Sequence, residues 1–184
     1  AIADGEPMRA FDKATIHRYW NNNHEHPGLA KVIQGINHGL WFKALNIVDE
    51  GTSFRMATIL QAAGVLLIIF FVGLKFFGLG PAIFAALAFA LMPRVFFHAH
   101  LNTFDMPNVF FWMLTVMLFW RGLEKPGYTL LAAISWGLAM AVRNSGVFIS
   151  IFVVLLYVRS PLMPDAWRAL KNITAGIKAF GWKR

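Results

Sequence analysis

The pattern of apolar and polar residues divides the chain into a polar first part and a strongly apolar remainder. Polar residues interrupt residues 1–54 throughout, whereas long uncharged stretches follow. Met56–Leu74 contains no charged residue and is long enough to cross a bilayer, which takes about 20 residues. Phe76–Met92 and Met106–Trp120 are predicted as two further spans.

The last apolar stretch, Thr129–Val158, is too long for one span and too short for two full ones. As a single helix it would extend about 45 Å, whereas a bilayer core is about 30 Å thick. The polar sequence RNSG at residues 143–146 interrupts it, so we expect two short spans that meet at a turn. A single tilted helix with a buried arginine is the alternative. The pattern thus predicts an all-α integral membrane protein with about five transmembrane helices.

Within the polar first part, apolar residues recur at helical spacing from Leu29 to Val48. The sequence Pro27-Gly28 marks the expected start of this segment, which is typical of an amphipathic helix lying on a membrane surface. We therefore expect three regions. Residues 1–54 form an external loop with an interfacial helix, residues 55–158 form a transmembrane bundle, and residues 159–184 form a basic interfacial tail.

Composition supports this assignment and excludes several classes of protein. Of the 184 residues, 58% are hydrophobic and only 14% are charged, against about a quarter charged in soluble domains. The absence of cysteine excludes a disulfide framework and a thiolate metal site. The sequence pI of about 10.2 would suit a nucleic-acid partner. However, the bases flank apolar segments, which is typical of contact with membrane lipid, and we expect no nucleic acid.

The positions of the bases also predict the orientation in the membrane. If residues 1–54 lie outside, then Lys75, Arg121, Lys125 and the basic tail lie in the cytoplasm, as the positive-inside rule requires. We expect a bacterial inner membrane, with the N-terminal region periplasmic and the tail cytoplasmic. This orientation places the polar residues 94–105 and 143–146 on the same outer face as the N-terminal region.

Three ionisable residues on that face are candidate site residues, because charge at membrane depth is costly. Arg94 follows Pro93 directly after a span, and Arg143 lies between two apolar runs. Each guanidinium could hold a phosphate through two hydrogen bonds, or could instead extend to lipid head groups. Asp105 could interact with the start of a helix as a cap, or could belong to the site.

The N-terminal region holds further candidates. His24, Glu25 and His26 could ligate a divalent metal, although adjacent side chains rarely converge on one ion. The histidines at positions 98 and 100 could join them only if the loops meet. Asp4 and Glu6 form an acidic pair, which by itself is typical of a solvated loop.

The order of these segments carries a family resemblance. The acidic pair precedes HPGLAK at residues 26–31, which resembles an HPPLxK segment with Gly28 in place of the second proline. Arg55 then opens a span. A segment that joins two spans in the family resembles residues 92–112, MPRVFFHAHLNTFDMPNVFFW. A further segment, with a basic residue followed by a glycine, resembles residues 139–149, AMAVRNSGVFI. In these features the chain resembles the N-terminal portion of GT-C superfamily glycosyltransferases, in particular the protein O-mannosyltransferase and aminoarabinose-transferase group.

The resemblance implies a reaction and partners. A polyprenyl-phosphate-linked sugar would be transferred, with inversion, to a protein or envelope glycan or lipid acceptor at the outer membrane face. A loop carboxylate would act as general base, and basic groups would stabilise the departing phosphate. The family pair is contiguous Asp-Glu and this chain has Asp-Gly-Glu, so both members of the pair remain candidates for the base.

The resemblance also assigns residues to these roles. Asp4 is the better match to the catalytic aspartate, with Glu6 as the alternative. The resemblance implies phosphate-binding roles for His26, Lys31 and Arg143, and a place near the phosphate or a metal for Glu25. Reasoning from the residues adds Arg94 as a phosphate-binding candidate and Asp105 as a possible site residue.

Two departures from the family leave a second reading open. The first span that should precede the acidic pair, and the second half of the fold, are not found in this sequence. The alternative is therefore a non-catalytic GT-C-like subunit that packs with other subunits in a larger membrane complex. A small transporter or channel is a third option, disfavoured because the spans hold few polar residues at mid-depth.

Overall fold

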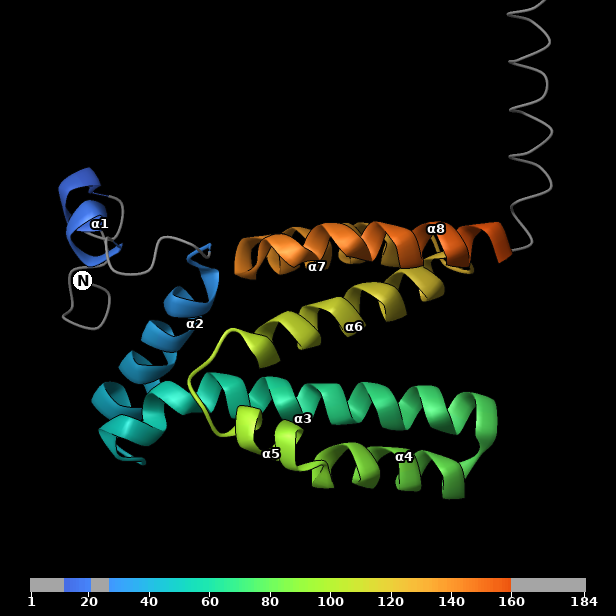
Figure 1. The fold of residues 1–184 in the computed structure, drawn as a ribbon, viewed down its shortest axis with the longest axis horizontal. Helices are drawn as coiled ribbons and strands as arrows, with labels where there is room; N and C mark the ends of the chain where they lie inside the picture. The colour runs from blue at the N-terminus through green and yellow to red at the C-terminus, as the bar shows by residue number, and fades with distance from the viewer. Residues whose placement is uncertain (1–11, 21–26, 160–184) are drawn as a thin grey trace, which may run out of the picture.

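The computed structural model describes residues 12–20 and 27–159, which form helices joined by short turns, and these residues contain no β-strand. Helices α3, α4, α6, α7 and α8 lie side by side, and α2 crosses one end of this bundle (Figure 1). The elements in chain order are α1 (Lys13–Trp20), α2 (Leu29–His38), the π-helix η2 (Gly39–Ala44), α3 (Glu50–Phe77), α4 (Leu79–Leu91), α5 (Pro93–Ala99), α6 (Asp105–Gly122), α7 (Gly127–Val142), the 3-10 helix η3 (Asn144–Phe148) and α8 (Ile149–Arg159).

Helix α3 is long and apolar enough to cross a membrane by itself, with 28 residues and a length of about 42 Å. It begins at Asp49, whose carboxylate accepts a hydrogen bond of 3.0 Å from the backbone N–H of Thr52. Hydrogen bonds from the side chain and the backbone of Thr52 hold the pKa of the Asp49 carboxyl below its usual range. The helix ends at Gly78, whose φ of 88° favours glycine, and α4 starts at the next residue.

The later apolar segments are interrupted where the sequence predicts interruptions, and the structure adds one short helix that was not predicted. Helices α7 and α8 are separated by η3, so the predicted break within Thr129–Val158 is confirmed and the single-helix alternative is wrong. That each of the two helices is a membrane span stays a prediction. Helices α4 and α5 meet at Met92 with a bend of 70°, so Pro93–Ala99 is a separate helix. The count of five spans stays a prediction, because several of these helices are shorter than a bilayer is thick.

The bundle buries small and polar residues and exposes large apolar ones. Along α3 the buried positions include Ser53, Ala57 and Gln61, spaced four apart on one face. By contrast, Phe84 and Leu91 on α4 are 75% and 74% exposed. Small residues at helix contacts with large apolar residues facing outward are typical of helices that pack in lipid.

The predicted surface segment also folds as a helix. It starts at Leu29, directly after Pro27-Gly28, and continues through η2 to Ala44, slightly short of the predicted end. Buried His38 joins it to α3, because its Nδ1 lies 2.9 Å from the Ser53 hydroxyl and its ring stacks on Phe54 at 4.2 Å. The Ser53 hydroxyl donates its own proton to the Glu50 carbonyl at 2.6 Å, so Nδ1 of His38 is the donor in their bond.

The turn between α7 and α8 depends on Gly146. The Trp136 indole N–H donates to the Gly146 carbonyl at 2.9 Å. A Cβ at position 146 would lie 2.9 Å from the Met140 backbone nitrogen and 3.0 Å from the Ala139 carbonyl carbon. Both neighbours are helix backbone and cannot yield as a flexible side chain would. The absence of a side chain therefore lets the turn fold back onto α7.

We expect Gly146→Ala to destabilise the protein by about 1–3 kcal/mol, the usual cost of overpacking. The matched control is Gly137→Ala on the neighbouring helix α7, where a Cβ would meet nothing within 4 Å and alanine favours the helix. Thermal unfolding in detergent measures both variants. Equal melting temperatures for the two would contradict the close approach at Gly146.

Candidate functional site

Three charged or titratable side chains from separate elements meet at one end of the bundle, and we call them the polar cluster: His98, Asp105 and Arg143. The Arg143 Nη1 donates to the Asp105 Oδ1 at 3.0 Å. The His98 Nδ1 lies 3.1 Å from the Asp105 Oδ2, an ion-pair distance when the imidazole is protonated, although the contact lacks hydrogen-bond angles. These side chains are 30–46% exposed, so an anion from solvent or from lipid can reach them.

The fold explains why residues far apart in sequence meet here. Helices α6 and α7 run antiparallel and pack closely, so the first residue of α6 lies beside the end of α7 (Figure 1). Buried hydroxyls fix their relative position, since Thr115 donates to the Phe111 carbonyl at 2.7 Å and lies 3.0 Å from the Ser135 hydroxyl. The cluster is thereby held by the rigid packing of two helices.

The contact with Arg143 gives the Asp105 carboxylate a partner on another helix. No side-chain hydrogen bond at the start of α6 is found among the described residues, so Asp105 does not cap the helix through a hydrogen bond, but its place in the first turn lets it interact with the helix dipole. The Asp105 carboxylate also binds one nitrogen of the Arg143 guanidinium and fixes the direction of that group. A guanidinium carries five N–H donors, so the others can bind an anion while Asp105 holds the group in place.

The structure brings two further predicted residues to the same end of the bundle. Ala30 on α2 is fully buried in one apolar cluster with Ala139 and Val142. Lys31, which follows Ala30 on the same helix, is half-buried. Arg94 is exposed on α5, four residues before His98, and therefore shares a helix face with it.

The remaining candidates lie outside the described residues: Asp4, Glu6, His24, Glu25 and His26. The proposed roles of the acidic pair and of His26 therefore stay predictions. Within residues 12–20 and 27–159, no three histidine or carboxylate side chains are grouped as metal ligands would be.

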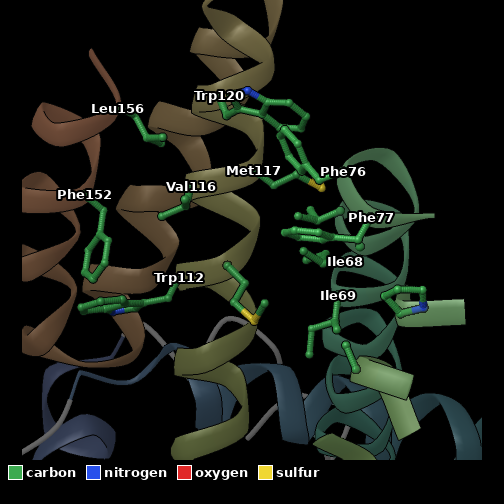
Figure 2. Close-up of a pocket in the computed structure, with 15 residues that line it drawn as sticks. Ile68, Ile69, Phe76, Phe77, Trp112, Val116, Met117, Trp120, Phe152 and Leu156 are labelled. Atoms are coloured by element: carbon green, nitrogen blue, oxygen red, sulfur yellow. The ribbon is translucent and has the colours of Figure 1, made fainter. Parts of the chain in front are cut away.

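An apolar groove, which the sequence reasoning missed, lies between helices α3, α4, α6 and α8 and has a volume of about 610 Å³. Figure 2 shows Trp112 and Phe152 toward one end of it, and Trp120 and Phe76 toward the other. The sequence signal is the spacing of Trp112, Val116 and Trp120, which places three large side chains on one face of α6.

The other end of the bundle is rich in bases, and we call it the basic end: Lys75, Arg121, Lys125 and Arg159, with Glu124 among them. Helices α3, α6 and α8 all end there (Figure 1). The Lys75 Nζ lies 4.3 Å from the centroid of the Trp120 ring and 4.0 Å from the Glu124 Oε1. The two ends of the bundle thus differ in chemistry, with a polar cluster at one and an excess of bases at the other.

Apolar helices with large exposed apolar surfaces, and charged groups near their ends, are typical of an integral membrane protein. The family model for dolichyl-phosphate-mannose-protein mannosyltransferase matches residues 40–177, about three quarters of the chain. The chain therefore belongs to this family of GT-C membrane glycosyltransferases, which confirms the resemblance found in the sequence. The matched region includes Arg94, Asp105 and Arg143 but not Lys31. Searches of curated proteins and of solved structures returned no match.

Proposed function

We propose that this protein transfers a sugar from a polyprenyl-phosphate carrier to an acceptor hydroxyl at the outer face of the membrane, with inversion at the sugar. Family membership carries this proposal. The polar cluster supports it, because an oriented arginine at the end of a membrane bundle suits a lipid-linked phosphate.

In the proposed reaction a loop carboxylate, Asp4 or Glu6, takes the proton of the acceptor hydroxyl. The acceptor oxygen then forms a bond to the anomeric carbon as the bond from that carbon to the phosphate oxygen breaks. The phosphate leaves with the electron pair, and Arg143 stabilises its charge through N–H groups that Asp105 does not use. One carboxylate is sufficient, because inversion by direct displacement forms no covalent sugar–enzyme intermediate.

Other basic residues would assist at the same phosphate. Lys31 lies on the helix that packs against Val142, and Arg94 shares a helix face with His98. His26, with Glu25 before it, would complete the site from the segment ahead of α2. A divalent metal near His24, Glu25 and His26 is a further part of the proposal.

We further propose that the polar cluster faces the periplasm and the basic end faces the cytoplasm of a bacterial inner membrane. Among the described residues at one end, the excess of bases over the acid Glu124 supports this orientation. Residues 1–54 then form the external loop, residues 55–158 the bundle of about five spans, and residues 159–184 the cytoplasmic tail.

The direct test uses the full-length protein in liposomes with polyprenyl-phosphate mannose as donor and envelope fractions as acceptors. We expect polyprenyl phosphate to be released over time, only when an acceptor fraction is present. If the donor binds but no acceptor fraction causes release of polyprenyl phosphate, the proposal is overturned and the non-catalytic subunit is favoured. Co-purification would then identify the larger complex to which that subunit belongs.

A further inference from the structure

We propose that the apolar groove and the basic end together bind one anionic glycerophospholipid, with its acyl chain in the groove and its head group at the basic end. This inference does not depend on sugar transfer, because it uses none of the residues assigned to the reaction. It rests on the length of the groove, on the end of the bundle that its lining reaches and on the charges at that end.

The groove has the depth of one membrane leaflet. On α3 its lining extends from Ile68 to Phe77, and on α6 from Trp112 to Trp120. These ranges correspond to about 13 Å and about 12 Å at the rise of an α-helix. Half of a bilayer core is about 15 Å, so the groove suits an acyl chain of a single leaflet.

The position of the groove selects the basic end for the head group. Its lining on α6 starts at Trp112, seven residues after Asp105, which is a separation of about 10 Å along the helix. At its other end the groove reaches Phe76 and Trp120, whose rings are 5.2 Å apart (Figure 2). A head group at the polar cluster would therefore be separated from the groove, whereas one at the basic end would adjoin its lining.

The charged groups at the basic end favour an anionic head group over a zwitterionic one. The Lys75 ammonium is held over the Trp120 ring at 4.3 Å, and its side chain is 42% exposed. Its contact with Glu124 is at the limit of an ion pair, 4.0 Å. Arg121, the residue after Trp120, is also exposed. Among the described residues at this end bases outnumber acids, and clustered bases next to apolar surface attract anionic lipid.

The chain offers matched variants for each half of the site. Ala85 and Ala88 are both exposed on α4, but only Ala85 lines the groove, so Ala85→Phe fills the groove and Ala88→Phe is its control. Lys75→Gln combined with Arg121→Gln removes two positive charges at the basic end. Arg55→Gln is the control for charge, since Arg55 is exposed at the far end of the same helix as Lys75.

The experiment is native mass spectrometry of the full-length protein with phosphatidylglycerol or phosphatidylcholine of identical acyl chains. We expect one phosphatidylglycerol to be retained at least tenfold more strongly than phosphatidylcholine. Ala85→Phe should weaken retention of both lipids, and the double charge variant should remove the preference for phosphatidylglycerol. Ala88→Phe and Arg55→Gln should behave as the wild type.

Three outcomes would overturn the proposal. The first is equal retention of the two lipids by the wild type. The second is an unchanged preference in the double charge variant, which alters only exposed side chains and so remains informative if Ala85→Phe does not fold. The third is that polyprenyl phosphate displaces phosphatidylglycerol equally well from the wild type and from the double charge variant. This outcome would assign the groove to the polyprenyl tail of the sugar carrier.

Discussion

Replacing Arg143 by glutamine is expected to lower the turnover of sugar transfer by roughly 100- to 1,000-fold, the effect of removing one preorganised donor from a developing negative charge. The reason is the geometry at Asp105, which holds one guanidinium nitrogen at 3.0 Å and leaves the others for the departing phosphate. Glutamine keeps a polar side chain but has no charge. The measurement is kcat and KM with polyprenyl-phosphate mannose in liposomes.

Two further variants separate the charge of Arg143 from its orientation. Arg143→Lys keeps the charge without the planar pair of donors, and we expect it to retain more turnover than the glutamine variant. Asp105→Asn keeps the arginine but weakens the bond that orients it, so we expect a loss of about tenfold. The combination of Asp105→Asn with Arg143→Gln should be no slower than Arg143→Gln, because both act through one contact.

A folded Arg143→Gln variant with wild-type turnover would contradict this role. Arg143 would then be a lipid head-group contact, the other interpretation considered for it. Retention of the fold is measurable by thermal unfolding, with Gly137→Ala serving again as a benign reference on α7.

The second large effect is expected at the acidic pair near the start of the chain. Asp4→Asn should lower kcat by roughly 100- to 10,000-fold, the usual contribution of a general base, while leaving donor binding unchanged. Glu6→Gln should retain most of the turnover. The measurements are transfer and donor retention for both variants in parallel.

The two acidic variants also separate the competing functions. The reverse pattern, with loss only in Glu6→Gln, would assign the base to Glu6. Full turnover in both variants, or in the variant carrying both changes, would remove the loop carboxylate from the mechanism. Failure of the wild type to release polyprenyl phosphate at all would instead favour the non-catalytic subunit.

Most helix positions could be predicted from the sequence, because uncharged runs and their interruptions are local features. Gly78 ends α3, and the polar residues after Val142 end α7. Pro93 follows Met92 at the bend between α4 and α5, although the sharpness of that bend was not predicted. A proline at the start of a helix is compatible with either a continued span or a new helix.

The packing could not be predicted in the same way, because apolar helices in lipid lack a clear polar face. Helix α3 is nearly uniform in hydrophobicity, and its buried face is marked only by small and polar residues such as Ser53 and Ala57. The contact between Asp105 and Arg143 depends on how α6 and α7 pair, so the position of Asp105 in the sequence alone left a helix cap and a role in the site both open. The groove was missed for the same reason, since it needs the relative placement of four helices.

The lengths of the helices have a consequence for the surrounding bilayer. Helix α7 has 16 residues and α4 has 13, so they reach about 24 Å and about 20 Å, against about 30 Å for a hydrocarbon core. A span shorter than the core is accommodated by local thinning of the membrane. Because we propose that α4 and α7 are spans, we expect head groups and water to be drawn inward around their ends, including the end that carries Arg143. The membrane would thus be locally thinner at the polar cluster. In the proposed reaction, the polar acceptor would then meet the lipid-bound phosphate below the general level of the membrane surface.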